Sequence, residues 1–127
     1  MTRTVFANGS IFDGTGAPIG EGDVLVVDGA IADVGSGLDG DEHIDLAGRA
    51  VLPGLFDCHV HVQFRDIDMW RLVQQPFSYQ FYEAADNLRA TLAAGITTVR
   101  DGGGADLGTK QALEDGLIAG PRLLISL

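Results

Sequence analysis

The length, composition and charge of this sequence exclude several classes of protein. The chain has 127 residues, 46% of them hydrophobic, which is typical of a folded, core-forming polypeptide. Acidic residues outnumber basic ones by 18 to 8, so the net charge of −10 disfavours nucleic acid or an anionic membrane as a partner. The single cysteine, Cys58, excludes an internal disulfide, and no stretch has the length of a signal peptide or membrane span. We therefore expect a soluble protein of the reducing cytoplasm.

The first part of the chain, residues 1–52, has the pattern of short β-strands. DVLVV (23–27) and AIADV (30–34) flank Asp28-Gly29, a dipeptide that favours the tight turn of a β-hairpin. The segment before them supplies another one or two strands, interrupted at Asn8-Gly9. His43 stands alone in an acidic, loop-like segment and is expected on the surface.

Beyond Pro53 the pattern changes to alternating strand and helix. A helix is predicted from Tyr79, with Ser78 as its N-cap and Gly95 after its end. The spacing of its apolar residues predicts a core-facing stripe. This stripe consists of Phe81, Ala85, Leu88 and Leu92.

A second strand and a second helix follow. ITTVR (96–100) is short and β-branched, which is typical of a strand, and a glycine-rich loop comes after it. Thr109 is the expected cap of a helix that Gly120 ends, and residues 122–127 begin a third strand. Parallel strands need helix-sized connections, so this order predicts a parallel sheet with functional groups at the strand ends.

Two histidines stand one residue apart at the end of the first of these strands, LFDCHVHVQ (55–63). Because alternate side chains of a strand point to the same face, Asp57, His59 and His61 share one face. Two imidazoles so placed direct their nitrogens toward one point, and neutral imidazole is a common ligand of divalent transition metals. The alternative is that the histidines only form hydrogen bonds within a core. The pair favours the metal site.

Two aspartates are candidates for supporting roles. Asp57 either accepts a ring N–H from a ligand histidine or braces the strand. Asp101, after the second strand, contacts the charged end of a substrate, contacts a ligand histidine, or orders its loop and the next helix. Gly102–Gly104 lack the fuller spacing of a phosphate-binding loop, so flexibility explains them.

Aromatic residues crowd the segment between the first strand and its helix. They form either an apolar wall of a substrate pocket or ordinary packing of the loop and helix, and we expect packing. The aromatic residues are Trp70, Phe77, Tyr79, Phe81 and Tyr82. Cys58 alternates away from the histidines, so we expect it in the core rather than as a ligand or nucleophile.

Three segments together resemble one family. VLPGLFDCHVHV (51–62) resembles the first-strand signature of the amidohydrolase superfamily, metal-dependent hydrolases built on a (β/α)8 barrel. Residues 8–37 resemble the N-terminal part of the small β-sandwich that accompanies this barrel in many members. AGITTVRDGGG (94–104) is similar to the second strand and loop of the branch containing imidazolonepropionase-like enzymes and Xaa-Pro or Xaa-Lys/Arg dipeptidases.

The resemblance implies an α/β fold and an activity. Residues 1–52 would be the N-terminal portion of the β-sandwich, and residues 53–127 the first two βα units and third strand of an incomplete TIM-like barrel. His59 and His61 would be ligands of a centre of one or two divalent metals, with Zn²⁺ the commonest occupant. A metal-activated water would hydrolyse a C–N bond of an amide, dipeptide-like or cyclic amide substrate.

Family members take further ligands from later strands, namely a lysine that is often carboxylated, two histidines, and an aspartate that also serves as general base. None of these positions lies within this sequence, and a closed barrel needs about 250 residues. We therefore expect the N-terminal piece of a longer enzyme, inactive by itself. The alternatives are a non-catalytic remnant that binds a partner or self-associates into a homo-oligomer, and a structural α/β domain whose His-x-His is accidental.

Overall fold

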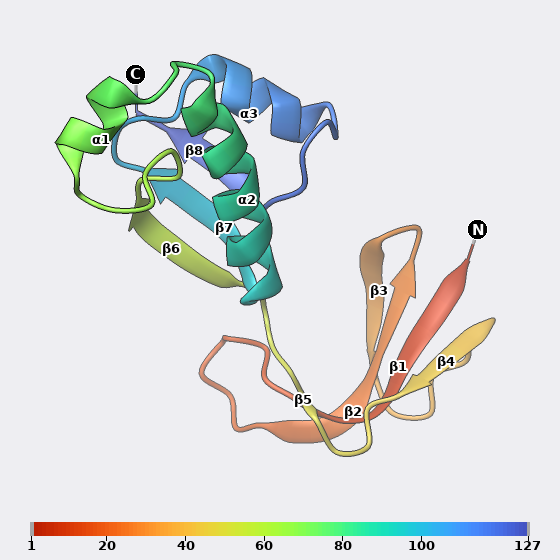
Figure 1. The fold of residues 1–127 in the computed structure, drawn as a ribbon. Coiled ribbons are helices and arrows are strands. Elements are labelled where there is room, and N and C mark those ends of the chain that lie inside the picture. Colours follow the sequence, from red (N-terminus) through yellow and green to blue (C-terminus); the bar gives the residue numbers. More distant parts are fainter. Residues whose placement is uncertain (1, 127) are drawn as a thin grey trace. The chain divides into compact units, whose positions relative to one another are not determined.

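The computed structural model describes residues 2–126, which form two compact units that divide between Pro53 and Gly54. The first unit is built of strands and the second of alternating strands and helices (Figure 1). This mixed α/β organisation agrees with the change of pattern in the sequence.

The first unit is a five-stranded sheet. Its strands are β1 (Arg3–Ile11), β2 (Gly20–Val27), β3 (Ala30–Gly35), β4 (Glu42–Asp45) and β5 (Ala50–Val51). The sheet order is β3-β2-β1-β4, and β5 also pairs with β1. Three apolar side chains, Val5, Val24 and Leu25, are buried in it.

The predicted hairpin is confirmed in the first unit. Strands β2 and β3 pair antiparallel, and both turn residues have positive φ, 49° at Asp28 and 80° at Gly29. The expected break at Asn8-Gly9 is only partly right, because β1 runs through it as one strand. Asn8 adopts a φ of 58° there and the register with β2 shifts, so the dipeptide makes a bulge.

The second unit contains the predicted parallel sheet. Strands β6 (Leu55–Val60), β7 (Ile96–Asp101) and β8 (Arg122–Ile125) pair in parallel in the order β6-β7-β8. Helices α2 (Tyr79–Ala93) and α3 (Leu107–Glu114) lie over one face of this sheet (Figure 1). Between them is the buried core, formed by Val62, Leu88, Val99, Ala105 and Leu123.

Helix α2 has the predicted bounds, and the predicted apolar stripe is buried at Leu88 but not at Leu92. Ser78 occupies the N-cap position, and Gly95 follows the helix with a φ of 88°. Ala84 and Leu88 are fully buried, whereas the predicted stripe residue Leu92 is 40% exposed. Leu92 lies in the last turn of the helix and is not among the described residues that pack on the core.

Helix α3 begins and ends earlier than predicted. Its cap is Asp106, whose carboxylate accepts the Thr109 N–H at 2.8 Å, so Thr109 is a helical residue and not the cap. The helix ends at Glu114 because Gly116 takes a φ of 71°. A further short helix, α1 (Met69–Gln74), was not predicted; the Asp68 carboxylate caps it.

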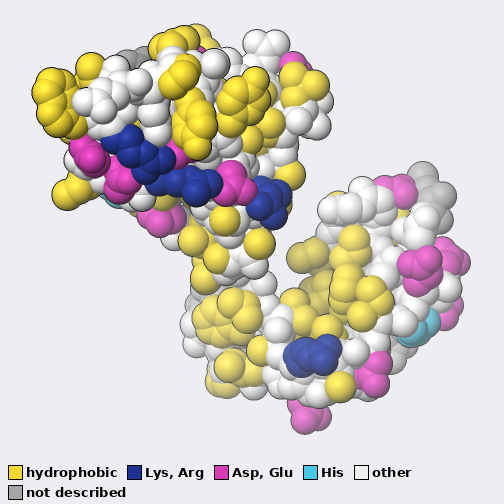
Figure 2. All heavy atoms as spheres, in the orientation of Figure 1, with side chains coloured by type: hydrophobic (Ala, Val, Ile, Leu, Met, Phe, Trp, Pro, Cys, Tyr) yellow, Lys and Arg dark blue, Asp and Glu magenta, His cyan; other side chains and the backbone are white. Residues whose placement is uncertain are grey.

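Several apolar side chains of the second unit are exposed, and Figure 2 shows them gathered on the face drawn there. The prediction that the aromatic residues pack within the loop and helix is therefore wrong for most of them. Trp70, Phe77 and Tyr82 are more than 70% exposed. Cys58 is also exposed, contrary to the expected core position. It lies on an edge strand, and the helices cover only the later residues of that segment, Val60 and Val62.

Within residues 2–126, no helix has both the length and the apolar character that a membrane crossing requires. His43 is exposed, as predicted.

Candidate metal-binding site

The two histidines of the His-x-His pair lie beside each other at the end of β6. His59 belongs to the strand and His61 follows its last residue, Val60. Their ring centroids are 5.2 Å apart, with the rings at 75° in an edge-to-face arrangement, and both residues are exposed. The strand therefore presents two accessible imidazoles at one point, as the alternation predicts.

Both rings lie against the backbone of Gly102, the residue after β7. A Cβ atom at this position would be 3.1 Å from Nε2 of His59 and 3.4 Å from Cε1 of His61. These contacts are closer than a methyl group normally makes. Glycine thus leaves the space in which the imidazoles of one strand approach the end of the next.

A hydrogen bond to the β7–α3 loop fixes the tautomer of His61. Its Nδ1 lies 2.7 Å from the carbonyl oxygen of Gly103. A carbonyl has no proton to give, so Nδ1 must donate, and in the neutral ring Nε2 keeps its lone pair. The ring of Phe64 stacks on the other side, with centroids 5.7 Å apart and the planes at 27°. His61 is therefore oriented, with Nε2 available to a ligand.

The carboxylate of Asp101 is fully buried, and within residues 2–126 its hydrogen-bond donors are all backbone N–H groups. Oδ2 accepts from Val62 at 2.8 Å, and Oδ1 accepts from Gly103 at 2.7 Å and Ala105 at 3.3 Å. Of the three roles considered for Asp101, these contacts correspond to loop ordering. Its side chain joins the loop after β6 to the loop after β7.

Asp57 braces its own strand. Its Oδ1 accepts the backbone N–H of His59 at 3.1 Å, where the register between β6 and β7 shifts. No bond from Asp57 to an imidazole ring is present among the described residues. Of the two roles considered for it, the contact corresponds to the brace.

Helix α2 holds the segment after β6 through a group that the sequence reasoning missed. The side-chain N–H₂ of Asn87 donates to the carbonyl oxygens of Val62 at 2.9 Å and Phe64 at 3.4 Å. The partners are backbone atoms more than twenty residues away along the chain. No local pattern in the sequence marks such a contact.

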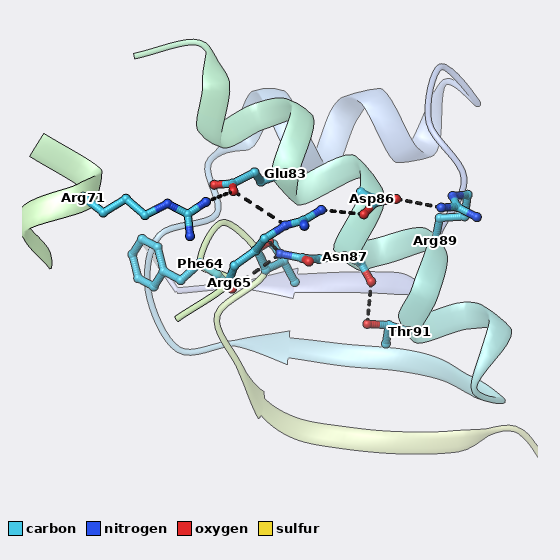
Figure 3. Close-up of polar contacts among 9 residues, drawn as sticks. Phe64, Arg65, Arg71, Glu83, Asp86, Asn87, Arg89 and Thr91 are labelled. Atoms are coloured by element: carbon cyan, nitrogen blue, oxygen red, sulfur yellow. Dashed lines mark hydrogen bonds and ion pairs between the residues drawn. The ribbon is translucent and has the colours of Figure 1, made fainter. Parts of the chain in front are cut away.

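Ion pairs extend this attachment along α2, and Figure 3 shows Arg65 between the carboxylates of Glu83 and Asp86. Arg71 of α1 pairs with the buried Glu83 at 2.5 Å, and Arg89 pairs with Asp86 at 2.6 Å. The pKa of Asp86 is lowered, first by the hydrogen bond from Arg89 and also by Arg65. The pKa of Arg71 is raised by its hydrogen bond to Asp66 and the charge of Glu83.

The side chains of the His pair suit a transition metal, because imidazole is a common ligand of such ions and the Gly103 carbonyl leaves Nε2 of His61 free to bind. Among residues 2–126, however, no group of three or more His, Cys, Asp or Glu side chains is placed to hold a metal together. The described residues thus bring two histidines together without a third such side chain beside them.

Comparison with known proteins identifies the family. The sequence model of the Amidohydrolase family matches residues 50–127, and the chain belongs to this family. The resemblance found in the sequence is thereby confirmed.

Relatives of known activity match only part of the chain. A segment of 59 residues is 42% identical to adenine deaminase of Listeria innocua and covers 46% of this chain and 10% of that protein. A segment of 63 residues is 38% identical to dihydroorotase of Pelotomaculum thermopropionicum and covers 48% of this chain and 15% of that protein.

Solved structures match almost the whole chain. A prolidase complexed with N-methylphosphonate-L-proline has a TM-score of 0.88 and 35% identity, over 98% of this chain and 32% of that chain. A. niger ochratoxinase has a TM-score of 0.77 and 27% identity, over 98% of this chain and 31% of that chain. The fold is thus that of the N-terminal part of amidohydrolase structures, and the chain spans about a third of these solved relatives.

Proposed function

We propose that this chain forms the N-terminal part of a metal-dependent hydrolase that cleaves a C–N bond. Residues 1–52 would be a portion of a β-sandwich, and residues 53–127 the first two βα units and third strand of a barrel. His59 and His61 would bind a divalent metal, with Zn²⁺ the first candidate. The closeness of the two imidazoles carries this proposal, because rings whose centroids are 5.2 Å apart beside Gly102 are near enough to bind one metal ion together.

The residues of the chain would bind and orient. His61 would offer Nε2, since Nδ1 donates to Gly103, and His59 would lie beside it with its backbone N–H held by Asp57. A metal bound there supplies Lewis acidity toward a carbonyl and lowers the pKa of a bound water. Two imidazoles leave a four-coordinate ion incomplete, so the other ligands and the general base would come from outside residues 1–127.

The substrate class follows from the relatives. Adenine deaminase, dihydroorotase and prolidase are named for small molecules or peptides. We propose a small amide, dipeptide-like or cyclic amide substrate, hydrolysed in the cytoplasm.

Metal analysis of purified protein tests the proposal, using the longest natural reading frame that contains residues 1–127. We expect bound zinc in the wild type and its loss in a His59→Asn, His61→Asn double variant. His43→Asn is the matched control, since His43 is exposed in the other unit and should leave the metal content unchanged. A double variant that retains the wild-type metal content would contradict the proposal.

A second candidate, a non-catalytic module that self-associates, rests on one observation. Strands β6 and β8 are the two edges of the three-stranded sheet, and they carry exposed apolar side chains at Leu55, Phe56 and Leu124. Sedimentation of metal-free protein distinguishes this candidate. It requires a concentration-dependent oligomer that Phe56→Ser and Leu124→Ser dissociate.

A further inference from the structure

We propose that Asp101 is a positioning residue for His61, acting through the backbone with Asn87 as its counterpart on helix α2. The inference rests on the proposed function only in that the free Nε2 of His61 is meant for a metal. The hydrogen-bond arrangement itself stands on the contacts of the described residues.

The side chain of Asp101 is buried away from solvent. A carboxylate with no exposed surface loses the hydration of its charge, so its oxygens need strong donors. All the donors recorded for it in residues 2–126 are backbone N–H groups, and no cation pairs with it. Asp101 therefore holds the backbone segments that carry these N–H groups, because moving one of them away would take a donor from a buried charge.

The two oxygens of this carboxylate bind the two segments that form the site, the loop after β6 and the loop after β7. Oδ2 holds Val62, the residue after His61, and Oδ1 holds Gly103, whose carbonyl accepts the His61 ring proton. The bond from the ring to that carbonyl therefore joins two segments that one side chain already holds. A further bond, from the Gly102 N–H to the Val60 carbonyl at 2.9 Å, ties the same segments together.

Asn87 completes the restraint from the opposite side. Val62 donates its N–H to Asp101 and accepts at its carbonyl from Asn87, so both backbone polar groups of this residue are engaged. Asn87 also reaches the carbonyl of Phe64, the residue that stacks on the His61 ring (Figure 3). The backbone on both sides of the imidazole is thus fixed before any ligand arrives.

This arrangement has a measurable consequence in the absence of metal. A free neutral imidazole side chain favours the tautomer with the proton on Nε2, whereas the bond to Gly103 requires it on Nδ1. If Asp101 holds the Gly103 carbonyl in place, its loss should release His61 toward the other tautomer. Long-range proton–nitrogen NMR of the imidazoles distinguishes the two forms directly.

The test compares wild type with Asp101→Asn in metal-free protein, using the same reading frame, well above the ordinary histidine pKa of about 6.5. We expect His61 to carry its proton on Nδ1 in the wild type and to show a mixture in the variant, with His43 as an exposed reference. Zinc affinity, measured by competition with a chelator, should fall by roughly 10- to 100-fold. Retention of the wild-type tautomer and affinity in a folded variant would overturn the inference.

Two further variants separate positioning from general stability. Leu88→Ala removes a core side chain next to Asn87 in the sequence and should lower the melting temperature without changing the tautomer; an equal shift in this control would overturn the inference. Asn87→Ala removes the hydrogen bond that holds the same backbone from helix α2. If Asp101→Asn fails to fold, the His61 tautomer in Asn87→Ala tests the inference instead. A wild type that shows the Nδ1 tautomer but no zinc affinity would leave the positioning role intact and refute the proposed function.

Discussion

Gly102 shows how one missing side chain shapes the candidate site. Its Cα lies against both imidazoles, and a methyl group there would sit 3.1 Å from Nε2 of His59. The φ of Gly102 is not in the left-handed region, so the need for glycine at this position is one of space and not of backbone conformation.

Gly102→Ala should therefore weaken zinc binding by roughly tenfold while the protein remains folded, because the displaced rings no longer present their nitrogens together. Gly108→Ala is the matched control. It makes the same chemical change in α3, where the new methyl group meets only ordinary contacts. Chelator competition measures both affinities, and wild-type zinc affinity in Gly102→Ala would contradict the geometry described for the pair.

The hydrogen bonds of Asp23 predict that the stability of the first unit depends on pH. Its pKa is lowered, first by the N–H of Asn8 and also by those of Gly37 and Leu38. A lowered folded-state pKa means that the carboxylate stabilises the fold above the ordinary aspartate value of about 3.9 and loses this effect as the pH falls through the folded-state pKa.

The difference in melting temperature between wild type and Asp23→Ala should thus be largest near neutral pH and shrink in acid. Thermal melts followed by circular dichroism at several pH values measure it. Asp28→Ala is no suitable control, since Asp28 has a φ of 49° in the hairpin turn. Asp39 lies outside the strands, so Asp39→Ala is the control. A gap that is constant with pH would count against the role of Asp23.

At the scale of elements, the start of α3 depends on one carboxylate. Asp106 Oδ1 accepts both the N–H and the hydroxyl of Thr109, each at 2.8 Å. Asp106→Ala should lower the free energy of unfolding by about 1 kcal/mol, as loss of an N-cap usually does. Asp106→Asn keeps a capping oxygen and should lose less. Urea denaturation measures both, and equal losses would show that the cap is not the cause.

The unequal burial of two leucines on helix α2 predicts how much each contributes to stability. Leu88 is fully buried, whereas Leu92, one turn later, is 40% exposed. Leu88→Ala should cost about 2–5 kcal/mol, because it leaves a cavity among the residues of the core. Leu92→Ala makes the same change on the same helix and should cost much less. Similar losses in urea denaturation would indicate that Leu92 is buried as deeply as Leu88, as the predicted stripe requires.

At the scale of the whole chain, each unit keeps its own core. The first buries Val5, Val24 and Leu25 within one sheet, and the second packs two helices on three parallel strands. The exposed apolar side chains of the second unit fit the proposal that further structure would cover them in a longer hydrolase. The family match over residues 50–127 coincides with the part that carries the histidines.

Patterns within a few residues of the sequence were sufficient to predict many of the strands and helices and the position of the histidines. The Asp28-Gly29 turn, the strand-and-helix alternation after Pro53 and the His-x-His pair all depend on local periodicity, which the chain carries in its residue order. The pattern that failed was also local. The apolar stripe through Leu92 predicts the helix correctly but does not say which of its apolar side chains the rest of the unit covers.

Only the tertiary structure decided which groups hold the histidines in place. The bonds from the Val62 N–H to Asp101, from the His61 ring to the Gly103 carbonyl and from Asn87 to the Val62 carbonyl join positions 39, 42 and 25 residues apart. Each of them involves a backbone atom, and every residue type has the same backbone. Residue order therefore revealed the imidazoles, whereas the packing of β6, β7 and α2 determined their supports, because hydrogen bonds to the main chain leave no mark on the identity of the partner.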